Sequence, residues 1–278
     1  MFLKARSNQI IQFLVVLLEL FFIATGCVAT DKNIDQSQEQ RIDKSATRSI
    51  PWSERSGLAV LKFVNTTSSE RANYFKPWEY GLSAMLTTDL VKTGMFNVVD
   101  RVRLNDILKE LELQKSGLVD QRTAVTIGKL IAAKYILTGT FMVVGKDLKI
   151  MAQVFSVDKG ILLGASSATG KTENFFLVEK DLFTSLTKIM RIMLNDEKKA
   201  YIMRTFETKS VDASLENYSG EIAMMKADEM KKMGDKKEAT MLRNYARQKF
   251  KEALKYDPGY ERAKENFANM VKAIPMTL

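Results

Sequence analysis

The sequence contains no histidine and only one cysteine among its 278 residues. Histidine is the side chain that most often serves as a general base and is the commonest metal ligand, so its absence removes the usual route to both kinds of site. A single cysteine excludes a disulfide within the chain and makes a zinc or iron–sulfur site very unfavourable. The composition therefore predicts a non-enzymatic protein that needs no cofactor.

Apolar residues make up 46% of the chain, which is typical of a globular protein and excludes a disordered one. The 42 basic and 33 acidic residues give a net charge of +9. This is a mixed surface with a basic bias rather than a polybasic tail. Such a surface tolerates anionic partners without implying any, and we expect no nucleic-acid partner.

The N-terminus has the three-part layout of an export signal over residues 1–26. Lys4 and Arg6 form a short positive region, and residues 10–23 form a mostly apolar run that ends in small residues before Cys27. That run is too short for an ordinary transmembrane helix, which needs about 20 residues. We therefore predict a signal peptide rather than a membrane span.

Small residues before a cysteine resemble the lipobox of bacterial lipoproteins, in which lipid is attached to the cysteine sulfur. Ala24 stands where leucine is usual, and Glu19 puts a charge in the apolar run. We predict lipid attachment at Cys27, the alternatives being an uncleaved anchor or an ordinary signal peptide with an incidental cysteine. Residues 27–55 are polar and lack a regular period, which predicts a lipidated N-terminus followed by a flexible tether.

Residues 56–200 alternate between strand and helix patterns. The apolar run 58–64 predicts a buried strand, and Leu82, Met85, Leu86 and Leu90 have helical spacing before Gly94. A short strand at 95–99 and two helices follow, one around 104–111 and one from Asp120 to Ile131.

From residue 135 the period changes to two, which predicts strands at 135–144, 148–157 and 161–169 joined by tight turns. Leu182, Leu186, Ile189 and Met193 then indicate a long helix. The predicted fold class is α/β: a mixed β-sheet flanked by helices, with a C-terminal helical segment.

Four segments in this region resemble the curli-secretion CsgG family: AVLKFVNTT at 59–67, MLTTDLVKTGMFNVVDR at 85–101, SGLVD at 116–120 and GKLIAAKYILTGT at 128–140. The resemblance implies a CsgG-like domain on the periplasmic side of the outer membrane that assembles with copies of itself and with envelope partners. Members of this family are lipoproteins as well. The curli channel also carries long pore-forming hairpins, which need roughly 20 residues each. Only a turn occupies 145–147 here, so we predict that this protein is not itself a pore.

Residues 164–172 at first sight resemble a phosphate-binding loop between a strand and a helix. Such a loop needs four residues between its first glycine and the Gly-Lys pair, whereas five separate Gly164 from Gly170-Lys171. We therefore predict a strand of small residues here and no nucleotide site.

Residues 210–274 are helical in composition, with breaks near Gly234 and at 257–259. Part of this segment resembles the second half of a tetratricopeptide repeat, at Tyr245, Ala246, Phe250, Ala253, Leu254, Asp257 and Pro258. A repeat stack normally needs about three units, so these helices must pack on the central domain or on another chain. Its basic residues predict a solvated face or, alternatively, a contact with an anionic envelope polymer or lipid headgroup; they are Arg243, Arg247, Lys249, Lys251 and Lys255.

Three functions are compatible with these patterns. The first is a lipid-anchored, non-catalytic scaffold on the periplasmic side of the outer membrane, which self-associates and acts as an accessory in envelope assembly or secretion. The second is a lipoprotein activator of an envelope, cell-wall-building synthase. The third is an enzyme with a Ser-Lys or paired-carboxylate site. The sequence contains no residue spacing that is typical of such a site.

Overall fold

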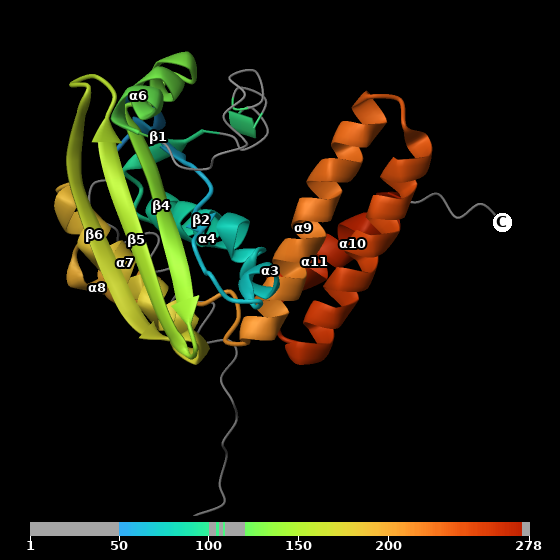
Figure 1. Cartoon of the computed structure of the whole chain (residues 1–278). Helices are drawn as coiled ribbons and strands as arrows, with labels where there is room; N and C mark the ends of the chain where they lie inside the picture. Colours follow the sequence, from blue (N-terminus) through green and yellow to red (C-terminus); the bar gives the residue numbers. More distant parts are fainter. Residues whose placement is uncertain (1–49, 100–103, 106–107, 109–119, 274–278) are drawn as a thin grey trace, which may run out of the picture. The chain divides into compact units, whose positions relative to one another are not determined.

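A computed structural model describes residues 50–99, 104, 105, 108 and 120–273 of the chain (Figure 1). The strands are β1 (Ser56–Val60), β2 (Val64–Asn65), β3 (Phe96–Val98), β4 (Tyr135–Val144), β5 (Asp147–Ser156) and β6 (Ile161–Lys171). The helices of the sheet region are α3 (Ala72–Phe75), α4 (Trp78–Lys92), α6 (Gln121–Leu130), α7 (Phe175–Ile189) and α8 (Asp196–Arg204). The C-terminal helices are α9 (Val211–Lys232), α10 (Lys236–Tyr256) and α11 (Glu261–Ala273). Two short 3-10 helices lie at Trp52–Glu54 and Thr172–Asn174.

The described strands form one mixed sheet in the order β3–β1–β4–β5–β6, and β2 pairs with β4 beyond the end of β1. β1 lies parallel to β3 and β4, whereas β4, β5 and β6 are antiparallel neighbours. The early strands are connected through helices and the later ones by hairpins, because parallel neighbours need a crossover and antiparallel ones do not. The predicted α/β fold class is confirmed.

Two glycines make the hairpin turns as short as the sequence predicts. Gly145 and Gly160 both have positive φ angles, of 60° and 63°, which glycine adopts without a Cβ penalty. β4 and β5 are consequently separated by only Gly145 and Lys146, and β6 leads directly into the 3-10 helix before α7.

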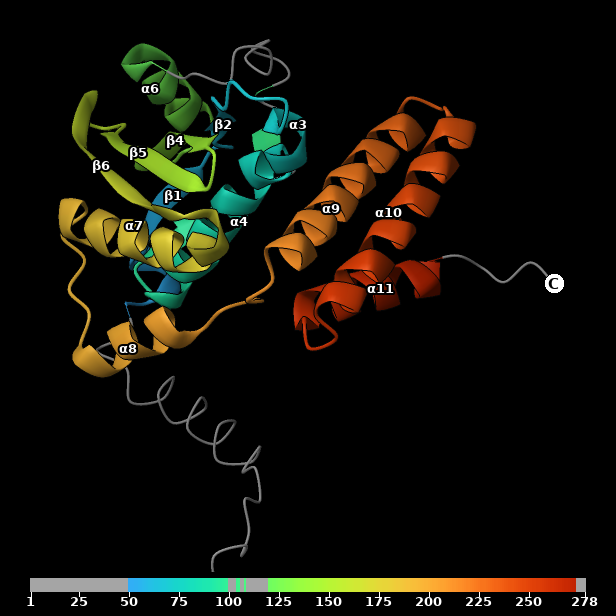
Figure 2. The same cartoon turned by 60° about the horizontal axis from the view of Figure 1, so that its bottom comes forward.

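Helices cover the two faces of the sheet unequally, and Figure 2 shows α6 and α7 on opposite sides of it. α4 and α7 pack on one face over the larger core, whose most deeply buried members include Trp78, Phe141 and Phe183. α6 covers only one end of the other face, where Ile127 and Ile136 pack with Phe155. Toward the opposite end of that face, alternate side chains of β5 such as Lys149 and Met151 are exposed.

The C-terminal helices begin and end where the sequence predicts the breaks. Gly234 has a φ of 89° after α9, and Asp235 caps α10 by accepting a hydrogen bond of 2.9 Å from the Glu238 backbone. α10 ends before Asp257, and α11 begins after Gly259. The likeness of this segment to a tetratricopeptide repeat stays a prediction.

Two of the predicted elements have different bounds in the structure, and the short helices α3 and α8 are not among those predicted. The predicted strand 58–64 is split into β1 and β2, because the Phe63 amide donates to the Glu79 carbonyl of α4 at 2.8 Å instead of continuing the ladder. α7 ends at Ile189 rather than reaching Met193, since Arg191 adopts a φ of 54° and Met193 is 82% exposed. Most of the helix predicted around 104–111 lies outside the described residues.

Candidate functional site

The first turns of α9 contact the sheet region through α3 and α4. The Trp78 indole N–H donates to the Ser214 hydroxyl at 3.3 Å, and the Tyr74 hydroxyl donates to the Asp212 carboxylate. Trp78 is fully buried and stacks on Phe175 of α7, with ring centroids 3.7 Å apart. α9 is thus joined to the largest aromatic cluster of the sheet region.

A glycine sets how closely α4 and α9 approach each other. A Cβ at Gly81 would lie 2.4 Å from the Tyr218 ring. Tyr218 is fully buried, and its hydroxyl donates to Glu207 at 3.0 Å, so the ring has no room to move away. The absence of a side chain at position 81 is therefore a requirement of this contact.

Gly81→Ala is expected to destabilise the protein by about 2 kcal/mol, since overpacking of a tight contact outweighs the roughly 1 kcal/mol that alanine gains over glycine in a helix. Thermal unfolding measures the change. Val91→Ala, at a half-exposed position of the same helix, is the matched control and should change little. A variant more stable than the wild type would contradict the tight contact, whereas partial recovery in Gly81→Ala/Tyr218→Leu would support it.

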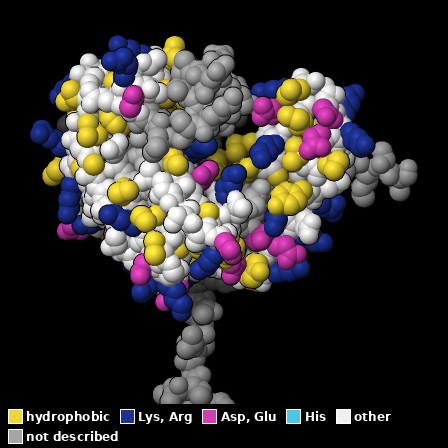
Figure 3. All heavy atoms as spheres, in the orientation of Figure 1, with side chains coloured by type: hydrophobic (Ala, Val, Ile, Leu, Met, Phe, Trp, Pro, Cys, Tyr) yellow, Lys and Arg dark blue, Asp and Glu magenta, His cyan; other side chains and the backbone are white. Residues whose placement is uncertain are grey.

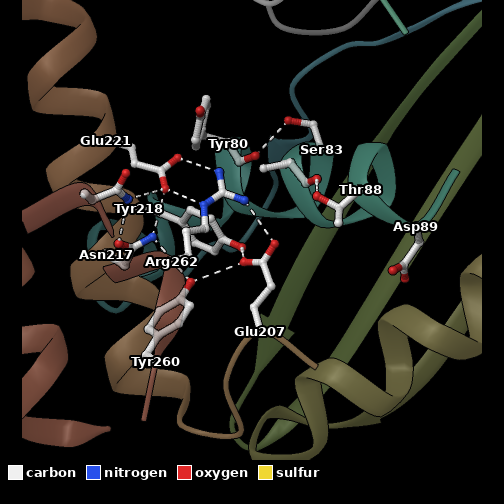
Figure 4. A network of polar contacts seen from close by, with 12 residues as sticks. Tyr80, Ser83, Thr88, Asp89, Glu207, Asn217, Tyr218, Glu221, Tyr260 and Arg262 are labelled. Atoms are coloured by element: carbon white, nitrogen blue, oxygen red, sulfur yellow. Dashed lines mark hydrogen bonds and ion pairs between the residues drawn. The ribbon is translucent and has the colours of Figure 1, made fainter. Parts of the chain in front are cut away.

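Arg262 of α11 lies at the centre of a polar network that joins α9, α11 and the segment before α9 (Figure 4). Its Nε and Nη2 atoms donate to both carboxylate oxygens of Glu221 on α9, at 2.6 and 2.8 Å. Its Nη1 donates to Glu207, in the segment between α8 and α9, at 3.0 Å. A planar guanidinium suits such a two-sided, bidentate contact. We call this set, with its tyrosine and asparagine partners, the junction network.

Four further side chains complete the junction network. The hydroxyls of Tyr218 and Tyr260 donate to Glu207 at 3.0 and 3.3 Å. The amides of Asn217 and Asn266 donate to Glu221, each at 2.9 Å. Burial alone would raise the pKa of Glu221, but the hydrogen bonds and charge of Arg262 outweigh it and lower that pKa. Both tyrosines have a raised pKa, chiefly through burial and then the charge of Glu207.

A second buried group of charges lies between α4 and α7. The Lys180 ammonium contacts the Asp89 carboxylate and lies 3.7 Å from the Glu179 carboxylate, and Lys92 lies 3.6 Å from Asp89. Burial, followed by the charge of Asp89, raises the pKa of Glu179 to about 8. A pKa of about 8 favours the protonated form of Glu179 at neutral pH, beside the ion pair of Asp89 and Lys180.

The two groups of charges influence each other through Glu207. Its negative charge raises the pKa of both Asp89 and Glu179, after the larger effect of burial. Its neighbour Phe206 also lies against Lys180, whose ammonium is 5.7 Å from the ring centroid. The segment before α9 thus connects the α4–α7 pair with the junction network.

The arrangement favours a structural role over a chemical one. The polar groups of the junction network bind one another: the guanidinium of Arg262 pairs with the carboxylates of Glu207 and Glu221, and the tyrosine hydroxyls and asparagine amides donate to the same two carboxylates. Across the residues that the structure describes, no cluster of three or more acidic or cysteine side chains has the geometry of a metal site. What the site does is to fix the C-terminal helices relative to α4 and α7.

The structure places the sequence-predicted features as follows. Cys27, the predicted lipid attachment residue, lies outside the described residues. Gly164 to Lys171 belong to β6, as predicted, and Lys171 pairs with Asp147 at 2.6 Å. Three members of the basic face are paired within the chain: Arg243 with Asp228, Lys249 with Glu216 and Lys255 with Glu252.

Sequence reasoning did not find the junction network or the charges between α4 and α7. One signal was available, since Asp89 lies directly before the apolar Leu90 and Lys180 lies between Val178 and Leu182, all at buried positions of amphipathic helices. A charge on the buried face of a helix predicts a buried partner. The identity of that partner, 91 residues away in this case, depends on the fold.

Searches among solved structures return partial similarities at low sequence identity. The LpoB C-terminal domain from Escherichia coli is 19% identical, with a TM-score of 0.34 over 48% of this chain and 94% of that one. A PelC dodecamer from Paraburkholderia phytofirmans is 13% identical, with a TM-score of 0.29 over 54% and 97%. TolB from Acinetobacter baumannii is 10% identical, with a TM-score of 0.35 over 51% and 30%. A search among curated proteins finds no match.

In the described part of the chain no helix combines the length and apolar character that a membrane crossing requires. The sequence profile described as "Curli production assembly/transport component CsgG" matches residues 37–181, which is more than half of the chain. The match includes strands β1 to β6 and the first part of α7. On this evidence the chain belongs to the CsgG family.

Proposed function

We propose that this protein is a lipid-anchored, non-catalytic accessory scaffold of envelope assembly or secretion on the periplasmic side of the outer membrane. Membership of a family described by assembly and transport supports the general role. The proposal further includes a signal peptide at 1–26, a lipid on Cys27, a tether to residue 55, a CsgG-like domain at 56–200, and self-association of that domain.

The observation that carries the proposal is the junction network. Arg262 binds two carboxylates that are mostly buried, 18% exposed at Glu207 and 11% at Glu221. Such pairs are costly to bury and are therefore poor sources of stability, but they fix geometry well. A network that holds α9–α11 in one orientation suits a protein that presents these helices, residues 210–274, to a partner.

Affinity purification of the full-length protein from its own envelope tests this function. We expect the protein to recover copies of itself together with an assembly or secretion component. Recovery of a cell-wall synthase, without self-association, would favour the alternative role of a synthase activator. Loss of the partner in a variant lacking 210–274, with self-association retained, would assign partner binding to the C-terminal helices.

Cys27→Ser is expected to release the protein from the membrane fraction, because a diacyl anchor would be lost and the remaining chain offers little to replace it. Fractionation with and without detergent measures the change. Thr30→Ser, just outside the lipobox-like segment, is the control and should remain membrane-bound. Retention of Cys27→Ser in the membrane, with an uncleaved N-terminus, would support the alternative of an uncleaved anchor.

A further inference from the structure

The described chain enters the sheet at one end. β1 begins beside the start of β3 and the start of β4, where Leu58 pairs with Tyr135. Tyr135 lies opposite Ser156 at the end of β5, and Ser156 lies opposite Ile161 at the start of β6. The first described residues are therefore at the same end of the sheet as the turn between β5 and β6.

Helix α6 lies across this end of the sheet. The side-chain amide of Gln121, at the start of α6, donates to the Gly160 carbonyl of the β5–β6 turn at 2.7 Å. Beyond the other end of α6, the Lys134 amide donates to the Gly57 carbonyl of β1 at 2.8 Å. α6 thus extends from the start of β6 to the start of β1. Three segments meet here and form what we call the entry surface: residues 52–56, 121–134 and 157–162.

A large apolar side chain is exposed on each of the three segments. Trp52 is 66% exposed, Leu130 is 52% exposed and Ile161 is 44% exposed. The backbone at Trp52 is held in place because the Asn97 side-chain amide donates to the Trp52 carbonyl at 2.8 Å. Single exposed apolar residues are common on protein surfaces, but one on each of three adjoining segments indicates a contact surface.

Basic side chains lie among these apolar ones, and Figure 3 shows dark blue and yellow side chains close together over α6 and the adjoining end of β6. The basic residues of the entry surface are Arg55, Arg122, Lys129, Lys134 and Lys159. None of them forms an ion pair with another described residue. Carboxylates lie on or beside this surface at Glu54, Asp120 and Asp158. The carboxylate of Asp120 already accepts from the Thr123 amide as the cap of α6, so the surface is positively charged overall.

The position of the proposed tether selects what this surface contacts. Ile50 is the first described residue and comes two positions before Trp52. As a coil, the tether from Cys27 to Ile50 would span roughly 25 Å, so the membrane that holds the proposed lipid is within reach of the entry surface. The chemistry also fits a membrane, because tryptophan and aliphatic side chains enter the headgroup region while lysine and arginine bind anionic headgroups.

We infer that the entry surface docks onto the membrane that carries the lipid anchor, with its three apolar side chains in the headgroup region and its lysines on anionic phospholipid headgroups. The inference rests on the proposed lipid at Cys27 and gives the anchored domain an orientation, in which the β4–β5 turn points away from the membrane. The contact is too small to hold the protein without lipid. The tether makes it effective, because it keeps the domain at a high local concentration near the membrane.

Tryptophan fluorescence tests this placement, because the chain has only two tryptophans. Trp52 is exposed, whereas Trp78 is fully buried in the core. The lipidated protein is incorporated into vesicles of phosphatidylethanolamine and phosphatidylglycerol that contain brominated phosphatidylcholine, since bromine quenches only fluorophores that it contacts. We expect the loss of most Trp52 emission. Trp52→Phe, in which only Trp78 remains, should show no such loss.

Neutralised lysines test the basic part of the surface. Lys129→Gln/Lys159→Gln should lower the ratio of docked to undocked domain roughly fivefold for each lysine, and Trp52 emission should recover accordingly. High salt should act in the same direction. Lys146→Gln/Lys149→Gln, in which exposed lysines at the opposite end of the sheet are changed, is the matched control and should be quenched like the wild type. Equal quenching in the two variants would overturn the assignment of the lysines to headgroups.

The possible failures of the fluorescence experiment are distinct. A protein that does not enter the vesicles would overturn the proposed lipid anchor together with this contact. A protein that is held in the vesicles while Trp52 stays unquenched would overturn the contact and leave the anchor standing. A Trp52 that is shielded from iodide before vesicles are added, and that brominated lipid does not quench, would show that a second copy or another protein covers the surface. That result would overturn the choice of a membrane.

Discussion

Arg262→Met is expected to release the C-terminal helices and to lower the free energy of unfolding by roughly 2 to 4 kcal/mol. Removing one member of a buried ion pair costs about 3–5 kcal/mol, because the remaining charge is left without a partner. Two carboxylates, Glu207 and Glu221, would be left here, while the 28% exposure of the arginine side chain admits some water and reduces the penalty. Methionine keeps most of the apolar volume, so the loss of charge dominates.

Hydrogen exchange and chemical denaturation check this expectation together. Exchange should rise in α9 and α11 well before it rises in β4 and β5, since the network joins the helices and not the sheet. Arg247→Met is the matched control, because Arg247 is exposed and its guanidinium lies 6.0 Å from the Phe267 ring, with no carboxylate partner among the described residues. In Arg262→Met/Glu221→Leu an unpaired carboxylate is removed, and part of the stability should return. Unchanged protection in α11 would refute the role given to Arg262.

Glu179→Gln is expected to make the protein much less sensitive to alkaline pH. The pKa of Glu179 is about 8 in the folded protein, against an ordinary value of 4.5. The folded state therefore binds a proton more tightly than the unfolded state, and the resulting stabilisation is complete below pH 4.5 and is lost as the pH rises through 8. Between pH 5 and pH 8 the wild type should lose about 3 kcal/mol that the variant does not lose.

Denaturation at several pH values measures this difference. The informative quantity is the free energy of unfolding of the wild type minus that of the variant at each pH. The contributions of the other titrating groups cancel in this difference. Glu173→Gln, at an exposed position just before α7, should give a difference that is flat with pH. A flat difference for Glu179→Gln as well would show that Glu179 stays ionised in the folded protein, stabilised by Lys180.

Elements with a strong local period were predictable from the sequence. The alternation along β4 and β5 fixed both strands, and the glycines at 145 and 160 fixed the turns, because positive φ angles favour glycine. The breaks between α9, α10 and α11 were equally local, since Gly234 and the Asp257-Pro258-Gly259 segment end helices wherever they occur. The α/β fold class followed from the order of these elements.

Features that depend on distant residues were not predictable in this way. The sequence pattern predicts a single strand where the structure has β1 and β2. The strand is interrupted because the Phe63 amide donates to a backbone carbonyl of α4. Residues 196–204 carry no strong apolar period, and α8 is stabilised by the burial of Ile202 against the core and by a cap in which Asn195 accepts from the Lys198 amide at 2.7 Å. The junction network needs Glu207 and Arg262, which lie on separate elements and have no shared sequence signal.

The segment between α8 and α9 would transmit mechanical force between the C-terminal helices and the sheet region. By its backbone alone, the segment Thr205–Ser210 would be a flexible linker between the sheet region and the C-terminal helices. Its side chains restrain it, because Glu207 binds Arg262 on one side and Phe206 lies against Lys180 on the other. A pull on α11 by a bound partner would therefore reach α7, and through it β6, as a displacement of packed side chains rather than as the straightening of a loop.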